Sequence, residues 1–203
     1  ERHFQDGRDV ILIGHAGHPE VIGTMGQLPE GAIFLIENVD QAKAFQPPKP
    51  EALAYTTQTT LSVDETAEIV AELKRRVPSI AAPHKEDICY ATTNRQQAVK
   101  DIAADCDAFF VIGAPNSSNS LRLVDVALKA GCPQSLLVQR AHDIDWAALG
   151  GIRRLGISAG ASAPEILVDE VLAAAAERFD VHLSRSTSEP ENMHFKLPVY
   201  LTA

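Results

Sequence analysis

Residues 10–14 read Val-Ile-Leu-Ile-Gly, a continuous apolar run of strand length that stops at a glycine. A run of this kind is typical of a strand that is buried on both faces. The small polar turn His15-Ala16-Gly17 follows, and Pro19 stands where the first turn of a helix is expected. The order of buried strand, short turn and helix recurs along the chain. The recurrence predicts an α/β protein whose parallel sheets are covered on both faces.

The pattern divides the chain into two similar halves, and we place their boundary near Pro83. We expect one α/β lobe at residues 1–83 and a second at 84–203, whose tail from Ser184 has little periodicity. The expected strands are 10–13, 32–36, 53–57, a segment around Ile80, 108–112, 135–138 and 154–157. The expected helices are 18–22, 39–45, 63–77, 92–105, 118–130, 143–149 and 164–178.

The helix expected at 63–77 carries the clearest helical signals. Residues 62–65, Ser-Val-Asp-Glu, fit a capping box at its start. Its apolar spacing predicts a face that packs on a sheet, made of Val63, Ala67, Val70, Leu73 and Val77.

Composition limits the possible partners. The 203 residues carry a net charge of −9, which disfavours nucleic acid and anionic membrane surfaces because both would repel the chain. The sequence has neither an apolar run near the roughly 20 residues that span a bilayer nor a visible signal peptide. Three cysteines at wide spacing do not form a disulfide framework, which favours a reducing, cytoplasmic setting. The chain begins at Glu1 without a methionine, so we expect a piece of a longer protein.

Three expected strands end in small, polar-rich turns that lead into helices, at 14–18, 113–120 and 158–164. Ligands of open parallel sheets bind beyond the carboxyl ends of the strands. The second turn places Ser117, Ser118 and Asn119 at a helix N-terminus, where the dipole and unpaired N–H groups favour an anion such as phosphate. The third turn offers Ser162 in a similar place. The alternative is that these side chains only cap their helices.

Polar side chains also follow the first and third strands. His18 and Glu20 stand close together at the end of the first strand, where an imidazole can donate to a phosphate and a carboxylate can transfer protons. Gln58, Thr59 and Thr60 follow the third strand directly, and one of the threonines could face a ligand. The alternatives are an ordinary helix start and an ordinary β-branched strand end.

Cys89 lies in a polar loop directly before a helix. Cys106 ends a helix and Cys132 lies in a turn before a strand, so both fit incidental small residues. The chain has no close pair of cysteines, so the spacing does not predict a self-contained metal site. By its chemistry alone Cys89 is either a buried small residue or a nucleophile.

Taken together, several stretches resemble the family of 4-hydroxy-3-methylbut-2-enyl diphosphate reductases, the last enzymes of the methylerythritol phosphate isoprenoid pathway. They stand in the family's order and spacing and span nearly the whole chain. The matching stretches are residues 14–21 (GHAGHPEV), 23–26 (GTMG), 57–62 (TQTTLS), 87–96 (DICYATTNRQ), 116–120 (NSSNS) and 159–164 (AGASAP).

The resemblance implies a fold of three similar α/β lobes around a central 4Fe–4S cluster, with one cysteine ligand from each lobe. It implies reductive dehydroxylation of the allylic diphosphate to isopentenyl and dimethylallyl diphosphate, with a ferredoxin or flavodoxin as electron donor. Carried over by position, Cys89 would be a cluster ligand and Glu20 the proton donor. Thr59 would hydrogen-bond the substrate hydroxyl and position Glu20.

The resemblance also assigns a set of substrate-binding residues. The side chains expected to hold the diphosphate are His18, Ser117, Ser118, Asn119 and Ser162. Gln58 and Thr60 are expected in the walls of the pocket.

The chain departs from the family's pattern in one large respect. The family's N-terminal lobe, with two further diphosphate-binding histidines and the other two cluster cysteines, is absent from these 203 residues. Residues 1–83 would then be the middle lobe and 84–203 the C-terminal lobe. A single thiolate does not hold a 4Fe–4S cluster, so we expect this chain to be a truncated and by itself inactive part of the enzyme.

Two alternatives stay open at this point. One is a non-catalytic, diphosphate-binding fragment without a stable cluster. The other is an unrelated α/β enzyme of sugar phosphates in which Cys89 is a nucleophile.

Overall fold

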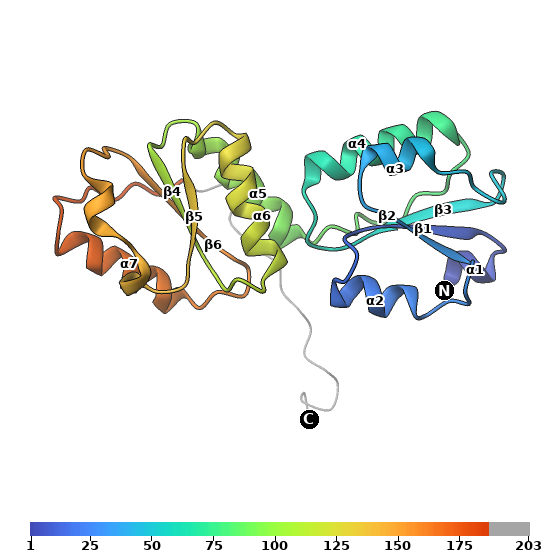
Figure 1. Ribbon diagram of the computed structural model, residues 1–203, viewed down its shortest axis with the longest axis horizontal. Coiled ribbons are helices and arrows are strands. Elements are labelled where there is room, and N and C mark those ends of the chain that lie inside the picture. Colours follow the sequence, from blue (N-terminus) through green and yellow to red (C-terminus); the bar gives the residue numbers. More distant parts are fainter. Residues whose placement is uncertain (187–203) are drawn as a thin grey trace, which may run out of the picture.

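The computed structural model describes residues 1–186 as two α/β lobes that lie next to each other (Figure 1). The first lobe holds a sheet in the order β2-β1-β3, made of β1 (Asp9–Ile13), β2 (Ile33–Ile36) and β3 (Leu53–Thr57). The second holds a sheet in the order β5-β4-β6, made of β4 (Ala108–Ile112), β5 (Ser135–Val138) and β6 (Leu155–Ala159). The strand pairings of both sheets are parallel. The expected α/β class is confirmed, and the expected irregular tail lies, from residue 187 on, outside the described residues.

Helices cover both faces of each sheet. The helices are α1 (Arg2–Gln5), α2 (Pro19–Met25), α3 (Val39–Ala44), α4 (Val63–Arg76), α5 (Tyr90–Ala103), α6 (Ser118–Lys129) and α7 (Glu165–Ala176). In the first lobe α3 and α4 lie on one side of the sheet and α1 and α2 on the other, whereas in the second lobe α7 lies opposite α5 and α6 (Figure 1). No helix among residues 1–186 is both long and apolar enough to cross a membrane.

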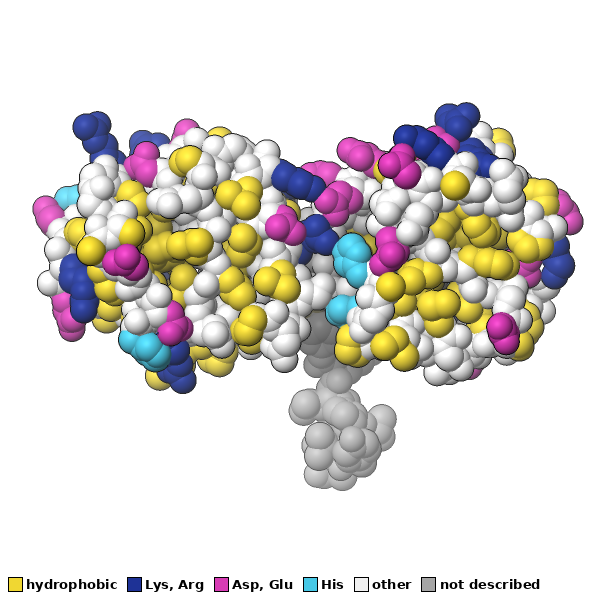
Figure 2. All heavy atoms as spheres, viewed as in Figure 1, with side chains coloured by type: hydrophobic (Ala, Val, Ile, Leu, Met, Phe, Trp, Pro, Cys, Tyr) yellow, Lys and Arg dark blue, Asp and Glu magenta, His cyan; other side chains and the backbone are white. Residues whose placement is uncertain are grey.

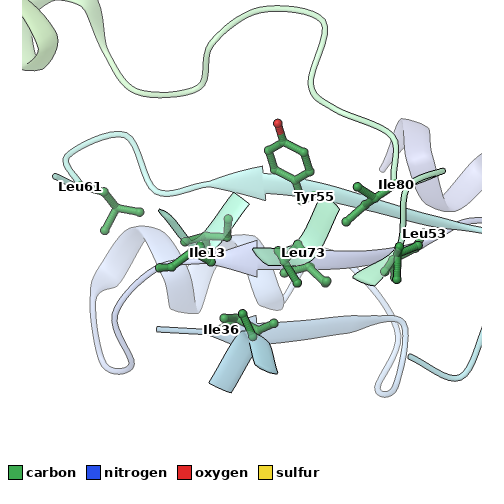
Figure 3. Close-up of a cluster of buried hydrophobic side chains, with 11 residues drawn as sticks. Ile13, Ile36, Leu53, Tyr55, Leu61, Leu73 and Ile80 are labelled. Carbon is green, nitrogen blue, oxygen red and sulfur yellow. The ribbon is translucent and has the colours of Figure 1, made fainter. Parts of the chain in front are cut away.

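The core of the first lobe follows from the alternation of side chains along β1. Successive side chains of a strand point to opposite faces of the sheet. Ile11 and Ile13 therefore pack against Leu73 of α4 on one face (Figure 3). Val10 and Leu12 pack on the other face, toward α2. Each of these buried side chains contributes about 1.5–3 kcal/mol relative to an exposed one.

The second lobe repeats this arrangement around β4. Phe109 and Val111 pack with Leu123 of α6 in one cluster, while Phe110 and Ile112 belong to the cluster beneath α7. Each hydrophobic cluster found in the described residues lies within a single lobe. Each lobe thus has a core of its own, and Ile88 of the segment after Pro83 packs against the core of the first lobe.

Two expected elements differ from the structure. The segment around Ile80 is not a strand, because only Ala81 pairs with the first sheet, in a single parallel bridge to Ala54. Pro83 follows at once and has no N–H to continue a ladder. Residues 143–149 are not one helix either, since two 3-10 helices, η1 (Ala141–Asp143) and η2 (Trp146–Leu149), flank a cap at Asp145.

The buried face of α4 also differs from the expected one. Thr66, Ile69 and Leu73 are buried, whereas Ala67 is exposed. Leu73 and Val77 are buried and Val70 packs against the same cluster, as expected, so the expected face is correct in part and Thr66 and Ile69 complete it. Because Thr66 is polar, the apolar spacing of the sequence does not include it in the buried face.

Candidate functional site

Glu20 and Thr59 meet at the carboxyl ends of β1 and β3. The two oxygens of the Glu20 carboxylate accept from the backbone N–H of Thr59, at 3.0 Å, and from its hydroxyl, at 3.1 Å. His18 caps α2, and its Nδ1 accepts from the backbone N–H of Glu20 at 3.2 Å. An imidazole nitrogen that accepts is unprotonated, so the Nε2 of His18 carries the proton and is free to donate. Glu20 is thereby held at a fixed place with its charge partly satisfied.

Cys89 lies beside this pair. Its backbone N–H donates to the carbonyl of Thr59 at 3.0 Å, and the residue stands at the N-cap of α5 with its thiol exposed. The loop before it is held by Asp87, whose carboxylate accepts from the Thr56 hydroxyl at 2.7 Å and the Thr57 N–H at 2.9 Å. Thr59 therefore contacts the Glu20 carboxylate through its hydroxyl and its N–H, and the backbone of Cys89 through its carbonyl.

A cavity of about 870 Å³ opens next to Glu20 on the first lobe, and its walls include Tyr55, His84 and Asp87. Burial, with a smaller contribution from the Asp87 carboxylate, raises the pKa of Tyr55. Ser117, Ser118 and Asn119 do not line this cavity.

Gln58, Thr60 and Ser118 form a bridge between the lobes. Gln58 is fully buried, and its amide oxygen accepts from the backbone N–H of His15 at 3.0 Å. Its Nε2 donates to the hydroxyls of Thr60, at 3.0 Å, and Ser118, at 3.4 Å, while the Thr60 hydroxyl donates to Ser118 at 3.0 Å. A hydroxyl accepts two hydrogen bonds and donates one. The Ser118 oxygen is filled by two donors, so its own proton is free for a ligand.

The N-terminus of α6 is arranged in the same way. Ser117 accepts from the backbone N–H of Ser120, at 3.3 Å, and from the Ser120 hydroxyl, at 3.0 Å. Its proton is therefore also free. Asn119 is only 6% exposed, and neither atom of its amide has a hydrogen-bond partner among the described residues. An unpaired buried amide costs about 1–3 kcal/mol, so Asn119 is unlike an ordinary capping residue.

Close packing of backbone holds this helix terminus against the sheet. A Cβ at Gly113 would lie 2.2 Å from the Ser120 oxygen, and one at Gly160 would lie 2.1 Å from it. Only glycine allows the turns after β4 and β6 to approach Ser120 so closely. Ser162, two residues after Gly160, is exposed in the turn before α7.

The other two cysteines lie apart from this site. Cys106 precedes β4 and Cys132 precedes β5, so both stand at the amino ends of strands, away from the edge that carries Cys89. Burial, with a smaller contribution from Cys132, raises the pKa of the Cys106 thiol. Residues 1–186 contain no group of three histidine, cysteine or acidic side chains that could hold a metal ion. The cysteines present supply one exposed thiolate and do not fit a 4Fe–4S cluster as a complete set.

The structure brings the expected residues into two groups. Glu20, Thr59 and Cys89 form the first group. The second lies at the N-terminus of α6 and consists of Ser117, Ser118 and Asn119, with Gln58 and Thr60 hydrogen-bonded to Ser118. The sequence did not indicate Arg122, a residue of α6 that contacts Glu65 and His15 of the first lobe. Its only signal is its position, one helical turn beyond Ser118 on the same face of α6.

These features define a class of α/β protein with polar side chains, an acid and an exposed cysteine at the carboxyl ends of parallel strands. The model of the family described as LytB protein matches residues 1–176. The chain belongs to this family, which confirms the resemblance and sets aside the alternative of an unrelated sugar-phosphate enzyme.

Relatives with this family's enzyme name match almost the whole chain. It is 60% identical over 198 residues to 4-hydroxy-3-methylbut-2-enyl diphosphate reductase of Cereibacter sphaeroides, covering 98% of this chain and 62% of the relative. It is 57% identical over 196 residues to 4-hydroxy-3-methylbut-2-enyl diphosphate reductase 2 of Rhodopseudomonas palustris, covering 97% and 61%.

A solved structure agrees with these relatives. That of E-1-hydroxy-2-methyl-but-2-enyl-4-diphosphate reductase from Plasmodium falciparum is 36% identical, with a TM-score of 0.80 over 85% of this chain and 54% of its own. The chain thus spans about three fifths or less of the length of the proteins that it matches.

Proposed function

We propose that this chain supplies the substrate-binding and proton-donating part of a 4-hydroxy-3-methylbut-2-enyl diphosphate reductase. The reaction is the reductive dehydroxylation of that allylic diphosphate to isopentenyl and dimethylallyl diphosphate. The names of the relatives support the reaction. The observation that carries the proposal is the position of Thr59, which contacts Glu20 through its hydroxyl and Cys89 through its carbonyl.

Glu20 and Thr59 would handle the proton that the reaction consumes. Removing a hydroxyl as water requires a proton at the leaving oxygen, and a carboxyl group within hydrogen-bond reach is a suitable donor. The Thr59 hydroxyl lies 3.1 Å from Glu20 Oε2, so it can relay a hydrogen bond between the carboxyl group and a substrate hydroxyl. His18 fixes the backbone of Glu20 from the other side.

The diphosphate would bind at the N-terminus of α6. The free protons of Ser117 and Ser118 and the unpaired amide of Asn119 are donors that no other described group uses. His18 and Ser162 would contribute from neighbouring turns. Gln58 and Thr60 would contribute indirectly, because their hydrogen bonds orient the Ser118 hydroxyl toward the ligand.

Cys89 would be one ligand of the iron–sulfur cluster that supplies the electrons when bound. Its thiol is exposed at the start of α5, where a cluster can reach it. A three-thiolate site needs two further cysteines, and we propose that they come from a third lobe outside these 203 residues. We further propose a cytoplasmic setting and a ferredoxin or flavodoxin as electron donor.

Glu20→Gln tests the acid. In the complete protein we expect kcat to fall about 10²–10⁴-fold, because the shape is kept and the proton donor is lost. Iron and sulfide content and the substrate KM should stay near the original values. Glu30→Gln, an exposed acid on the same lobe, is the matched control. A Glu20→Gln enzyme that turns over at nearly the original rate would rule out the assignment.

Asn119→Leu tests the diphosphate site. Since the amide is buried without a partner, an apolar side chain of similar volume should raise the free energy of unfolding by about 1 kcal/mol. The same change should weaken substrate binding at least tenfold, because the N–H donors and the acceptor oxygen of the amide are lost. A structural amide would give the opposite pair of results, with lower stability and unchanged affinity.

A second candidate function is diphosphate binding without redox chemistry, which the single thiolate near the site favours for the 203 residues alone. Iron and sulfide analysis of this chain after anaerobic reconstitution separates the two candidates. A stable cluster on this chain would exclude the second candidate, and pyrophosphate binding without iron would support it.

A further inference from the structure

Arg122 lies on α6 and reaches from the second lobe to two elements of the first. Its Nη1 donates to the Glu65 carboxylate of α4 at 3.1 Å, and its Nη2 lies 2.9 Å from Nε2 of His15. A third contact, to Asp125 at 3.3 Å, stays within α6. The guanidinium group carries donors only, so the imidazole nitrogen of His15 must accept. Arg122 thus binds a carboxylate and an imidazole at once, both across the interface.

His15 ties this contact to the proposed site. It stands three residues before His18 in the turn that follows β1, and its backbone N–H is held by Gln58 at 3.0 Å. Arg122 stands four residues after Ser118, so the two side chains share one face of α6. One contact therefore joins the turn that presents His18 to the helix whose first turn presents Ser118.

The interface that Arg122 spans is polar. Charged and histidine side chains gather where the lobes meet, while hydrophobic side chains lie over the middle of each lobe (Figure 2). Each hydrophobic cluster of the described residues stays within one lobe. The relative orientation of the lobes therefore depends on hydrogen bonds and ion pairs, which are directional.

Several other contacts join the lobes, among them the ion pairs of Lys100 with Asp64, at 2.7 Å, and of Lys129 with Glu65. Gln96 of α5 binds the backbone of Leu61 and Val63, near the covalent connection between the lobes. Ser118 binds Gln58 and Thr60. A contact near the covalent connection still allows one lobe to rotate against the other. A second contact, farther from the connection, is needed to prevent this rotation.

The environment of Arg122 suits this role. Its side chain is 14% exposed, and its Nε is buried without a partner in the part of the chain that the structure describes. Burial would raise the pKa of Glu65, but the hydrogen bond from Lys129 and the charges of Arg122 and Lys129 outweigh it and lower that pKa. The carboxylate is consequently charged at neutral pH and bound by two cations of the second lobe.

We infer that Arg122 is a positioning residue, which sets the α6 donors against the His15–His18 turn so that both reach one anion. The inference rests on the proposed diphosphate site. It does not require the redox reaction, because it concerns only how two parts of the anion site are held together.

The test uses the 203-residue chain with inorganic pyrophosphate as the probe, titrated by calorimetry. Arg122→Ala should weaken pyrophosphate binding about tenfold, since residues that share one hydrogen-bond and ion-pair network are energetically coupled. Arg122→Lys should recover only part of the affinity, because an ammonium cannot reach both partners in the planar geometry of a guanidinium. Arg75→Ala is the matched control: this exposed arginine pairs with Glu72 in the first lobe and should leave the affinity unchanged.

Changes at His15 supply the double-mutant cycle. His15→Gln keeps an acceptor near the position of Nε2 and should bind pyrophosphate nearly as the parent chain does. His15→Leu should weaken binding as Arg122→Ala does, and the double variant should be no weaker than either single variant. Residual dipolar couplings, which report the angle between the lobes, should change in Arg122→Ala and not in Arg75→Ala.

Three outcomes would overturn the inference. They are an affinity of Arg122→Ala within twofold of the parent, single effects that simply add in the double variant, and a parent chain that does not bind pyrophosphate. The proposed function fails separately: if the complete protein binds pyrophosphate through Arg122 but does not reduce the allylic diphosphate, the reductase assignment falls and the positioning role stands.

Discussion

The packing around Ser120 allows a prediction in which two similar glycine substitutions behave differently. Gly113→Ala would place its Cβ 2.2 Å from the Ser120 oxygen and 2.6 Å from the Ser120 Cβ. Gly160→Ala would place its Cβ 2.1 Å from the same oxygen but 3.4 Å from the Ser120 Cβ, an ordinary contact. Overpacking of a tight core costs about 1–3 kcal/mol. Each single substitution should therefore lower the free energy of unfolding of the second lobe by about 2 kcal/mol.

Removal of the Ser120 oxygen separates the two cases. Ser120→Ala alone should cost about 0.5–1.5 kcal/mol, because its hydrogen bond to Ser117 is lost. In that background Gly160→Ala should cost nothing further, since no close contact remains. Gly113→Ala should still cost about 2 kcal/mol, since the approach to the Ser120 Cβ remains.

The assay is urea unfolding followed by the fluorescence of Trp146, the single tryptophan, which lies in the second lobe. A loss of about 2 kcal/mol corresponds to a midpoint lower by about 1 M urea. Gly23→Ala, in the first lobe with open space around its Cβ, is the control and should not lower the midpoint that Trp146 reports. Equal rescue of both glycine variants by Ser120→Ala would refute the packing argument.

Three further predictions concern stability, pH and the loop before the thiol. Leu123→Ala, at a fully buried position, should lower the free energy of unfolding by about 2–5 kcal/mol in the urea assay, while Leu121→Ala, 46% exposed on the same helix, should change it by less than about 0.5. Because the pKa of Glu65 is lowered, the stability that its ion pairs contribute is complete above the ordinary value of 4.5 and is lost as the pH falls through the lowered pKa. Dipolar couplings should therefore reveal a reorientation of the lobes only in that acidic range. Glu65→Gln should abolish this pH dependence. Asp87→Ala should accelerate hydrogen exchange of the Cys89 amide, because two hydrogen bonds that hold the loop are lost; an unchanged exchange rate would contradict this role of Asp87.

Local signals in the sequence predicted most of the elements. The strands at 53–57, 108–112 and 135–138 have the expected bounds, because continuous apolar runs between turn residues leave little ambiguity. The capping box expected at 62–65 is only half formed. Ser62 accepts from the backbone N–H of Glu65 as expected, but the Glu65 side chain turns to Arg122 and Lys129 of the other lobe. A tertiary ion pair has replaced a local one.

The contacts that build the site could not be derived from the sequence without the resemblance. His15 and Arg122 are 107 residues apart in the chain, so no local rule relates them. The polar run at 116–120 suggests capping and anion binding equally, and only the burial of Asn119 without a partner separates the two. Gln58 resembles an ordinary polar residue after a strand, yet it is the fully buried centre of the bridge.

The strand order has a consequence for how each lobe forms during synthesis. In both sheets the central strand, β1 or β4, is the first that the ribosome delivers, and its two neighbours come later. Every residue of these two strands is buried in the finished lobe. Each therefore emerges as a largely apolar segment with two open edges, one of which stays open until the third strand of its lobe has been made. These two segments are the parts of the nascent chain that most need protection from aggregation.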